Sequence, residues 1–436
     1  MNPREIALQA ITSPLGHLGP IRIPPLDPYK PYYGGKIHSH LYIVNRYGEG
    51  TPPGPSPQRD KAKRSVSSTL SGWKMFDEKA LGLMKRLMEA FGPSGFEREA
   101  SRICKEYMEP YADEVITDKL GSVIFVAKGS SDRPHVLLAG HVDEVGFVVS
   151  GIDEKSGFLT FNPLGGWWDQ VLLGQRVVVR TSKGDVPGVI AAKPPHILSP
   201  EERKKVVEKK DMFIDVGATS GEEAKEMGVK IGDPVVPWSP FNVIRNGKVA
   251  MGKAFDDRIG AFVLMEAIRR IKEEKIDHPN TVYGAATVQE EVGLRGAQTT
   301  AHVVEPDVGI VLEVDIAGDV PGIKPKEAPA KMGKGPSLIT YDRSMIPNQP
   351  LKEFVIKTAE EAGIPLQLSQ VMGGTDAGRI HLNRAGCPSV VIGVPTRHIH
   401  SHVGLLSLED AENAVRLVVE LIKRLDKETV ESFTAL

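Results

Sequence analysis

The chain has 436 residues, of which 41% are hydrophobic and 25% charged, as in a folded globular protein long enough for two domains. Its formal net charge of -2 offers no strong field to nucleic acid or an anionic membrane, so neither is expected as a partner. The two cysteines, Cys104 and Cys387, are too few for a disulfide framework, and no apolar run is long enough to span a bilayer. Together these features predict a cytoplasmic protein.

Residues 1–73 differ from the rest of the chain because they are rich in Pro and Gly and lack a sustained helical or strand period. We expect a largely disordered or atypical N-terminal extension, with one short stretch, 38–45, apolar enough for a strand. A helix is predicted directly afterwards, with Asp77 as its N-cap and Gly92 as its end.

Apolar strand-like runs then alternate with helical periods. Strands are predicted at 135–139, 281–288, 308–314 and 389–394, and helices at 257–271 and 407–425, the latter opening with Ser407 and Asp410 in a capping box. This alternation predicts a three-layer α/β domain, in two parts at 75–149 and 251–430, with helices on both faces of the sheet. Between these parts, residues 150–250 read as short β runs with Gly and Pro, which indicates a small inserted β domain.

Two acidic motifs accompany the first strand and the first long helix. His141 ends the run LLAGH, and Asp143, two residues later, can accept the other ring N–H of that imidazole and fix its orientation. Asp256 and Asp257 stand together at the head of a helix. Both could simply cap it, but a carboxylate with two oxygens is also what bridges two divalent cations.

Two further acidic clusters follow buried strands. Glu290 and Glu291 can point in different directions as they leave the strand, so one can bind metal while the other moves a proton. Glu313 and Asp315 lie on the same face of an extended chain, and their spacing cannot choose between them.

The last candidate motif is a group of histidines after the final strand. His398, His400 and His402 alternate there, and any of them could be a ligand. Open α/β sheets build their sites at such strand ends. A set of imidazoles and carboxylates suits a pair of Zn or Co ions, whereas Ca or Mg would favour oxygen ligands alone.

These motifs, in this order, resemble the TET-type, glutamyl-aminopeptidase-like family of dinuclear metallo-aminopeptidases, whose members are also often described as cellulases or endoglucanases. The similarity runs from about Met75 to the C-terminus through FGPSGFE, GHVDEVGF, NPLGGW, FDDRIG, VQEEVGLRGA, GGTDAG and VPTRHIHS. It implies an inserted β-barrel at 150–250 that serves oligomerisation. It also implies a cis peptide between Asp256 and Asp257.

For the site, the resemblance implies two divalent metal ions per subunit with five ligands and one general base. The implied ligands of one ion are His141 and Glu313, those of the other are Glu291 and His400, and Asp256 bridges both. Glu290 is the implied base, and Asp143 supports His141 from behind. The family pattern selects Glu313 by its distance from Asp319, although Glu replaces the more usual Asp there and Asp315 remains the alternative.

The expected activity is removal of N-terminal residues from peptides by a metal-activated water, in a homo-oligomer that forms a tetrahedral dodecamer. One alternative is an endoglucanase-type polysaccharide hydrolase, in which the histidines would be idle. The other is a non-catalytic peptide-binding assembly that kept the scaffold. The preferred N-terminal residue is not readable from the sequence.

Overall fold

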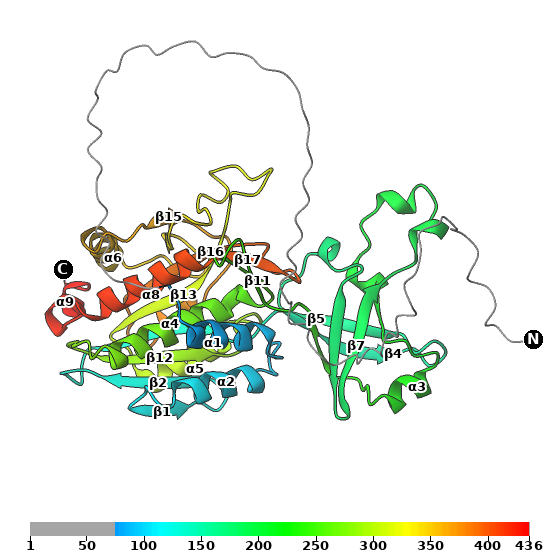
Figure 1. Ribbon diagram of the computed structural model, residues 1–436, viewed down its shortest axis with the longest axis horizontal. Helices are drawn as coiled ribbons and strands as arrows, with labels where there is room; N and C mark the ends of the chain where they lie inside the picture. The colour runs from blue at the N-terminus through cyan, green and yellow to red at the C-terminus, as the bar shows by residue number, and fades with distance from the viewer. Residues whose placement is uncertain (1–74, 436) are drawn as a thin grey trace, which may run out of the picture. The chain divides into compact units, whose positions relative to one another are not determined.

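The computed structural model describes residues 75–435, so the extension predicted at 1–73 and its strand at 38–45 lie outside the described residues. Between residues 75 and 435 the chain forms an α/β sheet flanked by helices and a separate closed β-barrel (Figure 1). The predicted fold class, a three-layer α/β domain with an inserted small barrel, is confirmed.

The main sheet has eleven strands. Its order is β1 (Glu114–Thr117), β2 (Val123–Lys128), β12 (Thr281–Thr287), β3 (His135–His141), β13 (Val308–Ile316), β16 (Ser389–Arg397), β17 (Gly404–Ser407), β11 (Val249–Gly252) and β10 (Asn242–Ile244); β14 (Ser337–Ile339) and β15 (Gln367–Ser369) branch from β16. The four predicted strands are confirmed as β3, β12, β13 and β16. Three of these strands run past the predicted ends, because residues beyond the apolar run, such as His141, Asp315 and Arg397, are still paired with a neighbouring strand.

Side chains of the central strands alternate between two apolar layers, as expected for a sheet that is buried on both faces. In β3, for example, Val136 and Leu138 enter one core, while Leu137 and Ala139 enter the other. The helices that cover the first face are α1 (Glu78–Glu89), α2 (Arg98–Met108), α4 (Phe255–Glu273), α6 (Gln349–Glu361), α8 (Leu408–Ile422) and α9 (Lys427–Ser432). The second face is covered by α5 (Arg295–Val304) and α7 (Ala377–Ile380).

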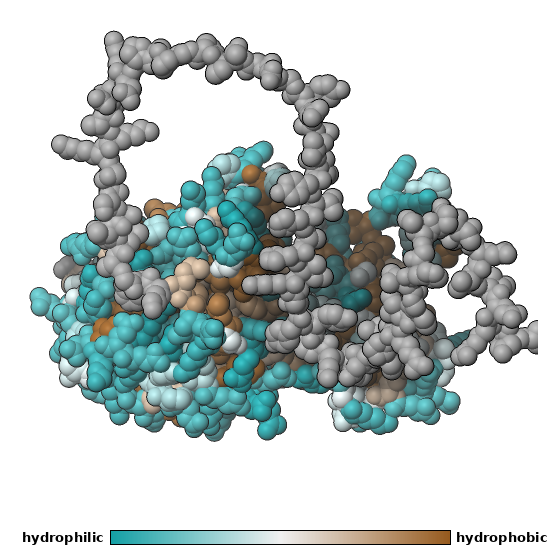
Figure 2. Space-filling view, viewed as in Figure 1, coloured by the Kyte–Doolittle hydropathy of each residue, from teal (hydrophilic) through white to brown (hydrophobic). Residues whose placement is uncertain are grey.

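Helix boundaries follow local signals in the sequence. The Asp77 side chain caps α1 by accepting a hydrogen bond from the backbone of Ala80, as predicted. In α2, charged residues such as Arg102 and Lys105 face solvent, and the surface over this helix is mostly hydrophilic (Figure 2). Amphipathic order of this kind is what docks a helix on the sheet.

The capping box predicted for α8 is only half formed. Ser407 caps the helix by accepting from the backbone N–H of Asp410. The Asp410 carboxylate does not complete the box; it accepts from the backbone N–H groups of Gly333 and Gly335 at 2.5 and 2.7 Å. This correction has a tertiary cause, because the segment before β14 packs against the helix and its N–H groups need an acceptor.

The barrel is closed by six strands: β4 (Gly146–Ile152), β5 (Leu159–Leu164), β8 (Phe213–Asp215), β7 (Gly184–Ala191), β6 (Arg176–Thr181) and β9 (Pro234–Pro237), with the short helix α3 (Gly221–Glu226). Its core is separate and includes Phe147, Trp167 and Val235. The strands from Asn242 onward pair in the main sheet. Within the part of the chain that the structure describes, no helix is both long and apolar enough to cross a membrane.

Candidate active site

The predicted site residues meet at one edge of the main sheet, where its parallel central strands end. His141 is the last residue of β3 and lies level with Thr287 at the end of β12, from which Val288 and Gln289 lead to Glu290 and Glu291. Glu313 lies in β13, and His400 follows β16. Because parallel strands present their carboxyl ends at the same edge, residues far apart in the sequence come together here.

The side chains form two groups that share one carboxylate. The first group is His141, Asp256 and Glu313, and the second is Asp256, Glu291 and His400; within each, one ligand-type atom per residue lies within 4.8 Å of the others. The two oxygens of Asp256 divide between the groups. Oδ1 lies 3.3 Å from Nε2 of His141, and Oδ2 lies 3.1 Å from Nε2 of His400.

Asp256 and Asp257 have different structural roles although they are adjacent in the sequence. Asp257 is fully buried, and its carboxylate accepts from the backbone N–H groups of Gly260 and His141. It therefore caps the helical part of α4 and holds the end of β3. Asp256 faces the site, and the peptide bond between the two residues is cis, as expected.

Asp143 makes hydrogen bonds to several of the residues that form the site. Its carboxylate accepts from the hydroxyl of Ser94 at 2.7 Å and from the backbone N–H groups of Glu290 and Glu291 at 3.0 and 3.2 Å. The Nδ1 atom of His141 lies 3.1 Å from the Asp143 carbonyl oxygen and 3.4 Å from its carboxylate. These contacts assign the proton to Nδ1 and leave Nε2 directed into the first group.

Burial and like charge shift the ionisation of the acids. Burial raises the pKa of Glu291 to about 8, with a further contribution from Asp256. Burial also raises the pKa values of Glu290 and Glu313 well above their ordinary range. For His400, burial alone would lower the pKa, but contact with Asp256 raises it to about 10. Buried carboxylates packed this closely need a compensating cation.

Three buried carboxylate oxygens have no hydrogen-bond partner among the described residues: Oε1 of Glu291, Oδ1 of Asp315 and Oδ1 of Asp376, whose other oxygen accepts from the hydroxyl of Thr287 at 2.5 Å. Of the three residues only Glu291 belongs to one of the two groups, and its orphaned oxygen supports the need for a cation there. An orphaned buried acceptor is costly unless a cation or donor satisfies it. Glu290 belongs to neither group, and its Oε2 atom lies 3.7 Å from Nε2 of His141.

The structure separates the alternatives that spacing could not. Asp315 belongs to neither group, and its Oδ2 atom accepts from the hydroxyl of Ser337 at 2.6 Å. His398 belongs to neither group. His402 is buried and packs on Trp167, with ring centroids 5.5 Å apart, and it also lies outside both groups.

Sequence reasoning gave no role to several residues that contact the site. Ser94 binds Asp143, and buried Glu97 accepts from the backbone N–H groups of Gly95 and Gln289, the residue before Glu290. Gly166, from the barrel, accepts from the ring of His400. These residues lie within FGPSGFE, VQEEVGLRGA and NPLGGW, but no spacing rule marks them as neighbours of a metal-type cluster.

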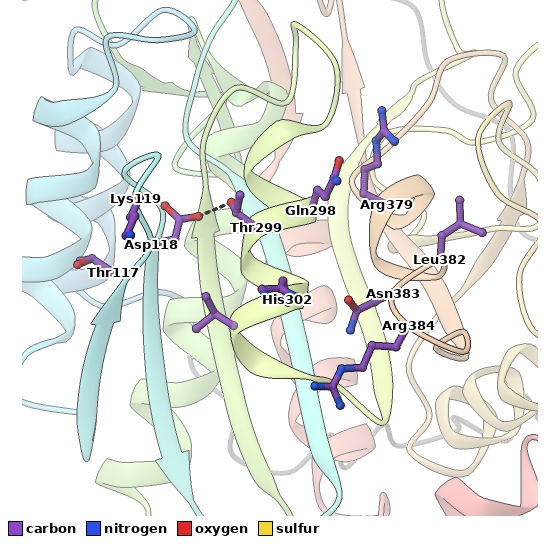
Figure 3. A pocket seen from close by; sticks show the side chains of 11 residues that line it. Thr117, Asp118, Lys119, Gln298, Thr299, His302, Arg379, Leu382, Asn383 and Arg384 are labelled. Atoms are coloured by element: carbon purple, nitrogen blue, oxygen red, sulfur yellow. Dashed lines mark hydrogen bonds between the residues drawn. The ribbon is translucent and has the colours of Figure 1, made fainter.

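A cleft of about 460 Å³ opens onto the cluster, and its remaining walls are mostly apolar, with Leu294, Ile316, Val371 and Ile399 among them. A second hollow, of about 720 Å³, lies between the β1–β2 turn, α5 and the residues after α7 (Figure 3). Its single acid, Asp118, is engaged by the hydroxyl of Thr299 and by backbone N–H groups of its own turn. The second hollow therefore lacks the gathered acids and imidazoles of the first.

The α/β sheet, the inserted barrel and the cluster of acids and imidazoles at the strand ends are those of a peptide hydrolase. The chain belongs to the M42 glutamyl aminopeptidase family, whose family model matches residues 121–417. It is 36% identical over 348 residues to the lysyl aminopeptidase of Pyrococcus furiosus, covering 79% of this chain and 96% of that protein. The family inferred from the motifs is thus confirmed.

Solved structures agree. The TET aminopeptidase of the marine sediment archaeon Thaumarchaeota archaeon SCGC AB-539-E09 is 79% identical, with a TM-score of 0.80 over 82% of this chain and 99% of that one. The Pyrococcus horikoshii TET1 peptidase, which can assemble into a tetrahedron or a large octahedral shell, is 34% identical, with a TM-score of 0.70 over 79% and 100%. A Thermotoga maritima protein named as an endoglucanase is 31% identical, with a TM-score of 0.65 over 83% and 100%.

Proposed function

We propose that this chain is a dinuclear metal-dependent aminopeptidase that removes N-terminal residues from peptides. The observation that carries the proposal is the position of Asp256, whose two oxygens each face a different histidine. A carboxylate shared in this way suits two divalent ions a few Å apart. The donor set fits Zn or Co, because it combines imidazole nitrogens with carboxylates and includes a buried oxygen of Glu291 without a partner.

In this proposal His141, Asp256 and Glu313 hold one ion, and Asp256, Glu291 and His400 hold the other. When bound, such ions lower the pKa of water and polarise the scissile carbonyl. Asp143 keeps His141 in the tautomer that leaves Nε2 free to bind, and it orients the backbone of both glutamates through their N–H groups.

Glu290 is the proposed general base. Its side chain is a member of neither ligand group, yet it lies beside both, which leaves its carboxylate free to take a proton from the attacking water. The same carboxylate then returns that proton to the leaving amine. The acids around the second group attract a free N-terminal amine, so the proposal is an exopeptidase rather than an endopeptidase.

Aminoacyl-nitroanilides should be hydrolysed by the purified chain, and a chelator should abolish that activity because both ligand groups would be emptied. Added Zn²⁺ or Co²⁺ should restore it. The measurement is the initial rate before chelation, after chelation and after each metal is added back. Full activity in the chelated protein, with metal loss verified by elemental analysis, would contradict the metal requirement.

The same assay separates the two alternatives. A protein with 31% identity is named as an endoglucanase, but a glycosidase of the ordinary kind needs two carboxylates that flank the sugar bond and no paired imidazoles. We therefore expect no release of reducing sugar from carboxymethylcellulose. A binding assembly without catalysis would hydrolyse neither substrate.

A homo-oligomer, with the tetrahedral dodecamer as the proposed form, is supported by the assemblies described for the TET1 peptidase. The barrel also exposes large apolar residues: Trp168, Ile197, Val206, Ile231 and Trp238. Exposed apolar residues mark surfaces of association where they form a contiguous patch. Calibrated light scattering should give a mass near twelve times the 47.4 kDa of one chain. A monomer at working concentration would contradict this expectation.

We further propose a cytoplasmic location, which is supported by the two cysteines being free and buried. The proposed division is a catalytic domain at 75–149 and 251–430 and an oligomerisation domain at 150–250. The barrel strands themselves begin at Gly146 and end at Pro237.

A further inference from the structure

The two ligand groups differ in the part of the fold that supports them. The first group is supported from within the α/β domain, since Asp143 contacts the ring of His141 and Asp257 binds its backbone. The second group has a neighbour from the inserted barrel. This neighbour is the pair Gly165–Gly166, which follows β5 directly.

Gly166 orients the imidazole of the second group. Its carbonyl oxygen lies 2.7 Å from Nδ1 of His400, so Nδ1 carries the proton and donates it to the carbonyl. The other ring nitrogen, Nε2, then points to Asp256 and Glu291 at 3.1 and 3.3 Å. A second contact is close as well, because a Cβ atom on Gly166 would lie 3.2 Å from Nδ1 of the same ring.

Gly165 packs against the other ligand of this group. A Cβ atom at this position would lie 2.9 Å from Oε2 of Glu291 and 2.7 Å from Cγ1 of Val145. The residue also has φ of +79°, a conformation that suits glycine. The backbone of Gly165 and Gly166 therefore packs closely against the side chains of Glu291 and His400.

The barrel fixes the position of the Gly165–Gly166 backbone through the residues that follow it in the sequence. Trp167 stacks on Phe147 in the barrel core, with ring centroids 4.8 Å apart, and its indole N–H donates to the carbonyl of Gly146. Lys209 donates from Nζ to the carbonyl of Trp167 at 2.9 Å and forms an ion pair with Asp169. Lys209 thus contacts the residues on both sides of Trp168, namely Trp167 and Asp169.

We infer that Lys209 is a positioning residue, which acts through the Gly165–Gly166 backbone to set the affinity of the second metal position, formed by Asp256, Glu291 and His400. The inference rests on the proposed function, because it assumes that this group binds an ion. It gives the barrel a part in the chemistry of its own subunit. The first position, with His141 and Glu313, does not depend on Lys209.

The test is Zn²⁺ binding by the full-length metal-free chain, measured by competition with a chromophoric chelator. Lys209→Met should weaken one of two Zn²⁺ ions by about 10-fold, within the range seen when the support of a metal ligand is removed, and leave the other within about twofold. The matched control is Lys225→Met, which removes the ion pair that Lys225 forms with Glu154 in the barrel domain. Both side chains of this pair are exposed, and Lys225 lies far in sequence from Gly165 and Gly166. The control variant should bind both ions as the unmodified chain does.

A second comparison separates positioning from a general loss of stability. In a His400→Ala background the second position is already lost, so Lys209→Met should cause no further change in Zn²⁺ affinity. If Lys209→Met folds poorly, Asp169→Asn breaks the same ion pair from the other side and should give the same pattern.

Normal binding of both ions by Lys209→Met, or an effect that persists in the His400→Ala background, would overturn the inference. Failure of the proposed function looks different, because the unmodified chain would then bind fewer than two Zn²⁺ ions. That result would remove both proposals, whereas normal binding by the variant removes only this one.

Discussion

Replacing Glu290 with Gln is expected to lower kcat by about 10²–10⁴-fold while the Zn²⁺ content stays at the level of the unmodified chain. The amide has nearly the same shape but cannot accept the proton of the attacking water. The backbone N–H of residue 290 would still donate to Asp143, so the loop should keep its position. The measurement is kcat, together with elemental analysis of the same sample.

Glu291 provides the matched control because it is the next residue and is also bound to Asp143 through its N–H. Glu291→Gln removes a proposed ligand, so it should lose Zn²⁺ as well as activity. The assignment of the two glutamates would be wrong if Glu290→Gln lost metal in the same way, or if it kept near-normal turnover.

Replacing Arg258 with Met is expected to lower the free energy of unfolding by about 3–5 kcal/mol. The guanidinium is fully buried and donates to the carbonyls of Leu87, Ala90 and Gly92 at the end of α1 and to that of Val142 after β3. It also lies 3.1 Å from Oε1 of Glu144. Methionine fills a similar volume but removes all of these charged donors from a buried region. Lys253 still binds the Ala90 carbonyl and Glu144, so the loss comes from the hydrogen bonds that only Arg258 makes.

The matched control is Arg86→Met, since Arg86 forms an ion pair with Glu106 in which both side chains are about half exposed. A surface pair of this kind contributes at most about 1 kcal/mol. Urea unfolding of the metal-free proteins would compare the two variants without the contribution of bound ions. Equal losses in both would contradict the role given to Arg258.

The location of the site could be predicted from the sequence because it depends on strand ends. Apolar runs such as the one ending at His141 are visible in the sequence, and parallel strands must present their carboxyl ends together. Which of the neighbouring acids contributes to each group of the site could not be predicted in this way. Glu313 and Asp315 are equivalent by alternation, and it is the fold that places Glu313 in the first group and Asp315 against Ser337.

Other features depend on contacts between distant segments. Asp256 and Asp257 both suit a helix start, and the bond from the backbone of His141 to Asp257 gives them different roles. The Asp410 carboxylate accepts from the backbone N–H groups of Gly333 and Gly335. This contact with a distant segment takes the place of the capping box that the local sequence suggests. The approach of Gly166 to His400 joins residues 234 positions apart, and no local pattern encodes it.

The position of β3 in the sheet has a consequence for the way the chain acquires its structure during synthesis. β3 pairs only with β12 and β13 in the described sheet, and both follow the barrel in the sequence. The barrel strands pair among themselves, so their hydrogen bonds can be completed as soon as Pro237 has been made. Until β12 emerges, β3 is an apolar strand with two unpaired edges, and edges of this kind make a newly made chain prone to aggregation.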